Sequence, residues 1–303
     1  MKSNFFSNKI ILSLAALFCC ALWGISTPIV KLGYNYIDAA SVPSLLLWAG
    51  IQFVLAGILT ILVYSLISKK IALPKRKSIV GILKISVFQT VLQYAFLYIG
   101  LLYTTAAKGA IIKSTDVFFI MLIASLIFKQ EKLTAKKIFS CIIGFAGIIV
   151  VNLNGLSFNI NPLGDFLVLL GIFFYSFAVV ITKPYSQNEE PFIICGYQMT
   201  FGGIIMLIIG IVFGGTMDYL GMLPVILVLS AIYAVSYSLW TVLLKYNPVS
   251  KVSIHSFMTP IFGVAFSGII LNEESNISPL NLVISLLLIS AGIILWSTNK
   301  ECR

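Results

Sequence analysis

A cation and an anion stand close together in an apolar part of the sequence. Lys113 and Asp116 lie in the stretch AAKGAIIKSTDVFF (106–119), and no further charge follows until Lys129. Side chains three residues apart on a helix are neighbours on one face. A charge at the centre of a membrane helix costs about 2.5–3.5 kcal/mol, so such residues face protein or water and tend to be functional. The pair is therefore the first candidate for a binding site.

Three kinds of chemistry fit this pair. In the first, Lys113 and Asp116 satisfy each other as a structural ion pair. In the second, Lys113 binds a substrate carboxylate and Asp116 binds an ammonium group, as a zwitterionic amino acid would require. In the third, Asp116 carries a proton. The sequence leaves all three open.

Polar and aromatic side chains recur at helical spacing in two other apolar segments. They lie in segments 78–102 and 221–245, and the residues are Gln89, Gln93, Tyr94, Tyr98, Tyr233, Tyr237 and Trp240. Hydroxyl and amide groups need partners in hydrocarbon, which favours a water-filled cavity, whereas simple packing of the rings is the alternative. Trp23, Thr27 and Tyr175 are further candidates for the same cavity.

Four residues are candidates for gating or proton transfer. Pro28 and Pro260 lie inside apolar segments, where each frees a backbone carbonyl, so each is read as a hinge or as a static kink. His255, the one histidine of the sequence, is a candidate proton relay or simply a packed donor. Lys31 stands near a segment end, where it reaches the headgroups or contributes to a gate.

The composition defines the class of protein. The 303 residues are 59% hydrophobic and only 10% charged, with a mean hydropathy of +1.05, against about 25% charged residues in soluble domains. The chain is therefore expected to be an all-α integral membrane protein. Basic residues are dispersed between apolar segments, which indicates membrane topology rather than nucleic-acid binding. We expect no metal, no cofactor and no enzymatic activity, because no clustered ligands, phosphate-binding glycine loop or nucleophile triad is found.

Ten apolar segments are long enough to cross a bilayer, which takes about 20 residues each. They are 10–32, 43–67, 78–102, 105–128, 135–153, 163–184, 191–214, 221–245, 251–271 and 278–297. The fourth includes the charged pair, because 117–128 alone would span only about 18 Å of a hydrocarbon core about 30 Å thick.

Lysines and arginines predict the orientation. With a cytoplasmic N-terminus, the inner connections carry nearly all of them, for example Lys69, Lys75 and Lys136, whereas the outer connections carry almost none. This bias is typical of the cytoplasmic side. We therefore expect a multi-pass protein of the cell membrane with both termini in the cytoplasm.

The sequence repeats itself. Residues 103–134 and 246–278 each open on a tyrosine, place a lysine five residues on, and contain an acidic residue near the end. One constant offset relates Tyr103, Lys108 and Glu131 to Tyr246, Lys251 and Glu274. Five helices per repeat is an odd number, so the second repeat (154–303) must run opposite to the first (1–153). Inverted repeats place a binding site near the middle of the bilayer and allow alternating access, which predicts a transporter.

The sequence also resembles a known group. WGISTPIVK (23–31), the glycine-rich fifth and tenth segments and the two Tyr…Lys…Glu units are similar to the drug/metabolite transporter superfamily, in its EamA-like branch. This resemblance implies a secondary carrier of amino acids, metabolites or drugs, often an exporter. It also implies a cavity lined by segments one, three, four, six, eight and nine. The chain departs from relatives at Lys113, Asp116 and Val117, where they carry small polar residues and a proline.

The prediction is a secondary transporter that exports small metabolites, amino acids above all, by alternating access. A nucleotide or nucleotide-sugar carrier, a channel-like permease and an intramembrane enzyme are the alternatives. The expected partners are a small-molecule substrate and the lipid bilayer, with proton coupling as one option. We expect a monomer or a weak dimer.

Overall fold

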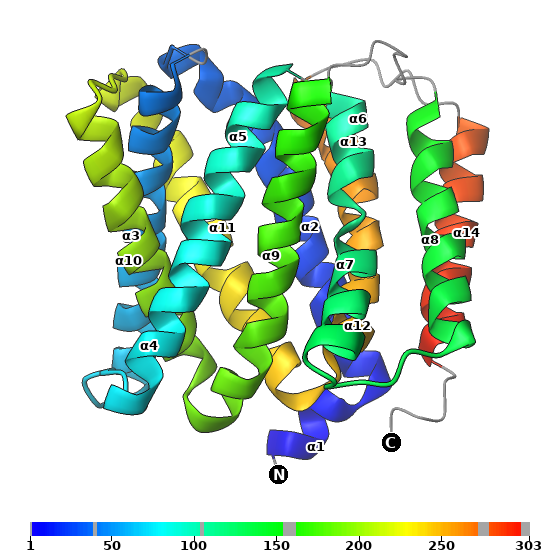
Figure 1. The fold of residues 1–303 in the computed structure, drawn as a ribbon. Helices are drawn as coiled ribbons and strands as arrows, with labels where there is room; N and C mark the ends of the chain where they lie inside the picture. The colour runs from blue at the N-terminus through cyan, green and yellow to red at the C-terminus, as the bar shows by residue number, and fades with distance from the viewer. Residues whose placement is uncertain (1, 39–40, 104–105, 154–161, 272–278, 298–303) are drawn as a thin grey trace.

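The chain is helical almost throughout. The computed structural model describes residues 2–38, 41–103, 106–153, 162–271 and 279–297. The helices stand side by side as a bundle (Figure 1). They are α1 (Lys2–Ser7), α2 (Lys9–Gly33), η1 (Tyr34–Tyr36), α3 (Val42–Ser68), α4 (Arg76–Ile85), η2 (Ser86–Leu92), α5 (Gln93–Tyr103), α6 (Ala106–Lys113), α7 (Asp116–Leu122), η3 (Ile123–Ile127), α8 (Ala135–Asn152), α9 (Pro162–Asn188), α10 (Pro191–Val212), α11 (Tyr219–Tyr246), α12 (Val249–Ser253), η5 (Ile254–Met258), α13 (Thr259–Leu271) and α14 (Pro279–Ser297).

Polar caps and prolines fix where the helices begin. The Asn8 side chain accepts a hydrogen bond from the amide of Ile10 at 2.9 Å, and Asp218 accepts from Leu220 at 3.1 Å. These bonds satisfy amides that the first turn of a helix leaves unpaired. Prolines stand in the first turns of α3 and α10, where the missing N–H costs nothing.

Within the described residues, seven helical spans are long and apolar enough to cross a membrane. They run over 9–36, 42–68, 76–101, 162–188, 191–212, 219–246 and 249–270. The other three predicted segments contain the interrupted stretch α6–α7–η3, the 18-residue α8 and the 19-residue α14. The structure thus confirms a multi-pass helical membrane protein, while the count of ten crossings stays a prediction.

The fourth predicted segment is not one continuous helix. α6 ends at Lys113, and α7 begins at Asp116. The amides of Ser114 and Thr115 bond three residues back, and the Thr115 hydroxyl donates to the Ile112 carbonyl at 2.6 Å. A threonine side chain that takes a backbone carbonyl competes with the helical ladder and bends it. The expectation of a single helix over 105–128 is therefore wrong.

The ninth predicted segment also changes its helix type. Short α12 passes into the 3₁₀-helix η5, and α13 follows from Thr259, with Pro260 in its first turn. Pro260 therefore begins a helix instead of kinking the middle of one. Pro28, by contrast, lies inside α2 as expected.

Several pairs of helices touch through glycines, and we call two of these contacts, α3–α10 and α8–α14, the glycine seams. In the α3–α10 seam, a Cβ on Gly57 would lie 2.6 Å from the amide nitrogen of Thr200. A Cβ on Gly203 would lie 2.6 Å from the amide nitrogen of Val54. No side chain fits at such distances, so the two backbones can approach this closely only where glycine stands.

The α8–α14 seam is built in the same way. A Cβ on Gly147 would lie 2.9 Å from the Ser285 carbonyl oxygen, and a Cβ on Gly292 would lie 2.8 Å from that of Ser140. The Ser285 hydroxyl also donates to the Gly147 carbonyl at 2.7 Å. Between the two seams, α2 packs against α11 and α13, and α5 and α7 pack against α9. The main buried cluster extends over this inner group and the α3–α10 pair, and it includes Phe53 of α3, Tyr94 and Trp240.

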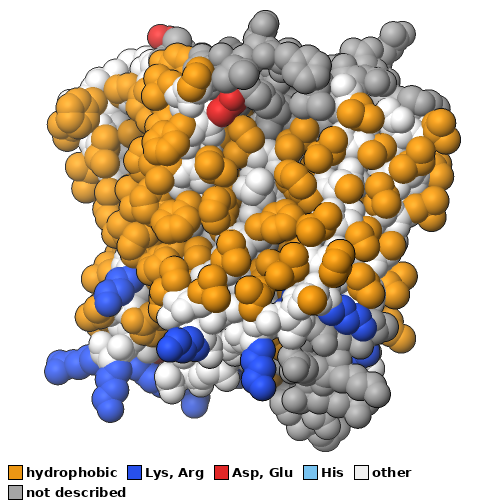
Figure 2. Space-filling view, turned by 45° about the vertical axis from the view of Figure 1, so that its right-hand side comes forward, with side chains coloured by type: hydrophobic (Ala, Val, Ile, Leu, Met, Phe, Trp, Pro, Cys, Tyr) orange, Lys and Arg blue, Asp and Glu red, His pale blue; other side chains and the backbone are white. Residues whose placement is uncertain are grey.

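Charged side chains are segregated along the bundle. Figure 2 shows lysines and arginines at one end, an apolar band around the middle and acidic side chains toward the other end. α1, α4 and α12 lie at this basic end (Figure 1). An apolar band of this kind suits a lipid environment, which confirms the predicted class of protein. Which end faces the cytoplasm remains a prediction.

Candidate functional site

A cavity of about 300 Å³ lies among the inner helices. Its walls come from α2, α5, α6, α7, α9, α11, η5 and α13. These elements belong to the first, third, fourth, sixth, eighth and ninth predicted segments, the set that the family resemblance implied. The cavity extends from Asp116 and Ser256 toward Lys31 and Tyr34, which lie near the end of α2 far from α1.

Most of the predicted site residues line this cavity. They are Trp23, Thr27, Lys31, Gln93, Tyr94, Tyr98, Lys113, Asp116, Tyr175, Tyr233, Tyr237 and Pro260. The structure brings these residues together from both halves of the sequence. Their roles in binding or gating stay predictions.

Four predicted residues lie elsewhere, namely Gln89, Pro28, Trp240 and His255. Gln89 is buried in η2, and Pro28 is buried in α2. Trp240 stands one layer behind the wall, with its ring centroid 4.9 Å from that of Trp23. None of these side chains lines the cavity.

His255 joins two helices outside the cavity. Its Nε2 lies 3.1 Å from the Ser13 hydroxyl on α2, and its Nδ1 lies 3.1 Å from the Val252 carbonyl oxygen. Both ring nitrogens therefore have protein partners. The packed-donor interpretation fits this geometry better than a proton relay in the cavity.

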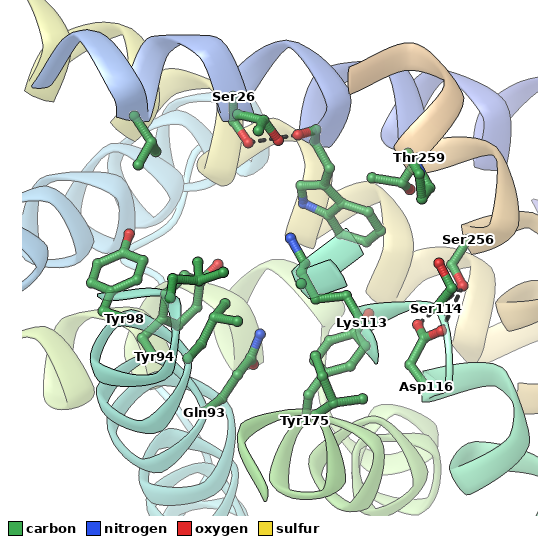
Figure 3. Close-up of a pocket in the computed structure, with 18 of the residues that line it drawn as sticks. Ser26, Gln93, Tyr94, Tyr98, Lys113, Ser114, Asp116, Tyr175, Ser256 and Thr259 are labelled. Atoms are coloured by element: carbon green, nitrogen blue, oxygen red, sulfur yellow. Dashed lines mark hydrogen bonds between the residues drawn. The ribbon is translucent and has the colours of Figure 1, made fainter. Parts of the chain in front are cut away.

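Lys113 and Asp116 point in different directions. Figure 3 shows Lys113 extending into the cavity and Asp116 turned toward Ser256. The Asp116 carboxylate accepts hydrogen bonds from the Ser256 hydroxyl at 3.0 and 3.1 Å and from the Val117 amide at 2.7 Å. Within the described ranges, no salt bridge joins Lys113 to Asp116. The turn at Ser114 and Thr115 separates the two side chains, so a closed ion pair is not formed.

Ser256 and Thr259 were missed by the sequence interpretation, although both line the cavity. The repeat could have found them. Lys251 follows Lys108 by 143 residues (251 − 108), and the same offset carries 113 to 256 and 116 to 259. At this offset, Ser256 and Thr259 correspond to Lys113 and Asp116 in the predicted repeat. Glu274, the acidic end of the second unit, lies outside the described residues.

Aromatic side chains form much of the cavity wall. The hydroxyls of Tyr94 and Tyr237 lie 2.8 Å apart and share a hydrogen bond. The rings of Tyr94 and Tyr98 meet edge to face, with centroids 5.5 Å apart. Such packed rings have few rotamers and hold their hydroxyls in place.

Several polar atoms at this wall have no hydrogen-bond partner among the described residues. They are Trp23 Nε1, Gln93 Oε1, Tyr98 Oη and Thr259 Oγ1. Buried polar groups are usually satisfied. The arrangement therefore offers both donors and acceptors to a bound molecule. No group of three or more potential metal ligands occurs in the described part of the chain.

The chain belongs to the EamA-like transporter family, whose model matches residues 10–153 and 162–298. It is 26% identical to the uncharacterized transporter YvbV of Bacillus subtilis over 94% of this chain and 91% of that protein. It is 29% identical to an uncharacterized transporter of Methanothermobacter thermautotrophicus over 67% of this chain and 61% of that protein. A solved crystal structure aligns with a TM-score of 0.74, covering 95% of this chain and 98% of the other at 14% identity. These matches confirm the predicted family and a general role in transport.

Proposed function

We propose that this protein is a secondary transporter that exports small metabolites by alternating access, with the cavity around Lys113 as the substrate site. The single observation that carries the proposal is a cavity lined by both halves of the chain that holds a lysine without a salt-bridge partner among the described residues. Amino acids are the first substrates to test, because their carboxylate matches the lysine.

The glycine seams support two oppositely oriented halves. Gly203 and Thr200 follow Gly57 and Val54 by 146 residues (203 − 57 and 200 − 54). Exchanging the halves therefore turns the Gly57–Thr200 contact into the Gly203–Val54 contact, and both are present at the same distance of 2.6 Å. A contact that maps onto itself in this way is expected of a two-fold axis.

The second seam repeats this relation. Gly292 and Ser285 follow Gly147 and Ser140 by 145 residues (292 − 147 and 285 − 140). The Gly147–Ser285 contact thus corresponds to the Gly292–Ser140 contact, at 2.9 and 2.8 Å. The packing of whole helices follows the same relation. α5 packs on α9, and their counterparts in the other half, α11 and α2, also pack on each other. An inverted repeat with ten crossings accounts for all of these pairs.

The size of the cavity favours a small substrate. Ligand pockets commonly measure about 300–1,000 Å³, and this cavity of about 300 Å³ is at the lower end. A nucleotide sugar would also call for several cations, whereas the described lining of this cavity contains only two lysines, Lys31 and Lys113. These features favour a metabolite of amino-acid size over the nucleotide-type alternative.

Counterflow in proteoliposomes tests the proposal. The purified protein is reconstituted into proteoliposomes. The vesicles are then loaded with members of an amino-acid and metabolite panel, and uptake is measured with and without a pH gradient. We expect saturable uptake that a substrate on the opposite side stimulates. Flux that does not saturate would indicate a channel-like permease.

Two substitutions test the site. Lys113→Ala and Asp116→Asn are each expected to abolish counterflow while the folded protein is retained, as judged by size-exclusion chromatography. If only Asp116→Asn uncouples flux from the pH gradient, Asp116 has the proton role. Full activity of both variants would remove this pair from the mechanism.

A further inference from the structure

The charges at the cavity are arranged asymmetrically. Lys113 extends into the cavity, and its amine has no hydrogen-bond or salt-bridge partner among the described residues (Figure 3). Asp116 also lies at the wall, but its carboxylate is held by Ser256 and Val117. Lys31 is the other charged residue of the lining and is a second cation. An anion therefore finds a cation without such a partner in this cavity, whereas the one carboxylate of its described lining already accepts from two donors.

The rest of the wall suits an apolar body. Seven aromatic side chains line the cavity, namely Trp23, Tyr34, Tyr94, Tyr98, Tyr175, Tyr233 and Tyr237. Leu97 and Ile172 add aliphatic surface. Rings of this kind bind apolar and aromatic groups through their faces and edges. The polar edge atoms of Gln93 and Tyr98 are available at the same wall.

We propose that the substrate is a monocarboxylate with an apolar or aromatic body, that Lys113 binds its carboxylate, and that no amino group is required. This inference rests on the proposed function and narrows its substrate class. Asp116 has a separate role, because it joins the first turn of α7 to η5 across the two halves of the chain. The ammonium group of a zwitterion would have to share the Asp116 carboxylate with the Ser256 hydroxyl and the Val117 amide.

Binding to the full-length protein in lipid nanodiscs tests the substrate class. The probes are 3-phenylpropionate, 3-phenylpropylamine, 3-phenylpropanol and phenylalanine, and the readouts are thermal stabilisation and tryptophan fluorescence. We expect 3-phenylpropionate to bind at least about tenfold more tightly than the amine and the alcohol, because a hydrogen bond to a charged group is worth a factor of about ten or more. Phenylalanine should bind no more tightly than 3-phenylpropionate.

Variants identify the receptor of the carboxylate. Lys113→Met is expected to weaken 3-phenylpropionate binding by about 10- to 100-fold, and Lys113→Arg should retain most of it. Lys84→Met is the matched control, because Lys84 is exposed on α4 and does not line the cavity. Equal binding of the amine, unchanged binding in Lys113→Met, or tenfold tighter binding of phenylalanine would each overturn the inference.

Counterflow separates this inference from the proposed function. Saturable counterflow of a different substrate class, with no binding of 3-phenylpropionate, would overturn the carboxylate class and leave transport standing. Binding of 3-phenylpropionate that depends on Lys113, with no flux of any panel compound, would support the binding chemistry and count against transport.

A second observation concerns the basic end of the bundle, which is closed by a buried ionic cluster. Glu131 and Lys137 form a salt bridge of 2.9 Å, with side chains only 7% and 3% exposed. The Glu131 carboxylate also accepts hydrogen bonds from the amide of Ser250, at 3.1 Å, and from its hydroxyl. The Lys137 amine lies 5.4 Å from the ring centroid of Trp296. The cluster thus links the first half of the chain to α12 and α14 in the second.

The geometry points to Glu131 and Ser250 as a gate that closes the cavity toward the basic end. The carboxylate is held by both the amide and the hydroxyl of Ser250, so it fixes α12 directly to the first half of the chain. Opening toward this end requires α12 to part from the chain segment that follows η3, and the Glu131–Ser250 bonds must then break. This second inference also presupposes a transporter.

A cross-link between these positions tests the gate. In a Cys302→Ser background, Glu131→Cys and Ser250→Cys are combined and joined by oxidation or by a short bifunctional thiol reagent. The described native cysteines are buried and should not interfere. Cross-linking is expected to abolish counterflow, and reduction of the disulfide should restore it. Each single variant should be unaffected by the same treatment. A cross-linked protein that transports at the parent rate would overturn the gate.

Accessibility provides a readout that needs no transport. Thr27 is exposed to the cavity, so Thr27→Cys reports on access to it. We expect Glu131→Ala, which removes both acceptors of Ser250, to raise labelling of this cysteine by an impermeant maleimide several-fold from the basic side, measured in vesicles of known orientation. Labelling that stays unchanged would refute the gate, whatever the cross-link yields.

Discussion

The hydrogen bond between Tyr94 and Tyr237 ties α5 to α11 within the cavity wall, and its two oxygens lie 2.8 Å apart. Both side chains are buried, so removing one hydroxyl leaves the other without this partner. Hydrogen bonds between membrane helices contribute about 0.6 kcal/mol on average and up to about 1.7 kcal/mol. This bond should therefore be measurable but modest.

We predict that Tyr94→Phe and Tyr237→Phe each lower the free energy of unfolding by about 1 kcal/mol. The double variant should lose less than the sum, because the partner left behind in each single variant is removed as well. Thermal unfolding of the four proteins in detergent gives the coupling energy. Strictly additive losses would mean that the two hydroxyls do not interact.

The candidate site could be predicted from the sequence in part. Intramembrane charges and polar stripes are rare enough in a membrane protein to be noticed, and Lys113, Asp116, Gln93 and Tyr237 do meet at one cavity. The separation of Lys113 from Asp116 could not be predicted. It accompanies the turn in which the amides of Ser114 and Thr115 bond three residues back, and an uninterrupted helix has the same residue spacing.

At the scale of helices, the seams set how closely neighbours can approach. The α3–α10 seam places a glycine Cβ position 2.6 Å from opposing backbone nitrogen atoms, closer than a methyl group can be accommodated. A backbone cannot move aside as a flexible side chain can. An added methyl group must therefore push the helices apart.

We predict that Gly57→Ala and Gly203→Ala each lower the free energy of unfolding by about 1–3 kcal/mol, because overpacking forces backbone shifts. Gly263→Ala is the matched control. A Cβ there would lie 3.8 Å from the nearest atom, and alanine is the better helix former. Thermal unfolding in detergent measures all three. If Gly263→Ala lowered the free energy of unfolding as much as the seam variants do, this account of the seams would be contradicted.

Helix positions follow from the sequence more reliably than helix continuity. Runs of apolar residues and proline or polar caps predicted the starts of α3, α10 and α14 within about two residues. The breaks after α6 and α12 were not predicted. Hydropathy averages over a window, whereas a break depends on single hydrogen bonds such as those of Ser114 and Thr115.

For the whole molecule, the distribution of lysine and arginine carries information on orientation. Residues far apart in the sequence, such as Lys75 near α4 and Lys251 in α12, belong to elements at the same basic end (Figure 1). The predicted excess of lysine and arginine in every second connection thus corresponds to a basic end of the folded bundle. Cytoplasmic loops carry such an excess.

We therefore predict that the basic end faces the cytoplasm. Lys70→Cys and Asn35→Cys place exposed thiols in the α3–α4 and α2–α3 connections. A membrane-impermeant maleimide should label the second in intact cells and the first only after permeabilisation. The unsubstituted protein serves as the control for native thiols. The reverse labelling pattern would invert the topology.

The seams have a consequence for the assembly of the chain. Under the proposed inverted repeat, each seam pairs a surface of one half with the equivalent surface of the other, as the isologous interface of a two-fold homodimer does. Residues Gly57 and Gly203 take equivalent places in one seam, and Gly147 and Gly292 do so in the other. Neither contact depends on the peptide link between the halves. Two polypeptides comprising 1–153 and 154–303, synthesised separately in one cell, should therefore find each other in the bilayer and rebuild the complete bundle.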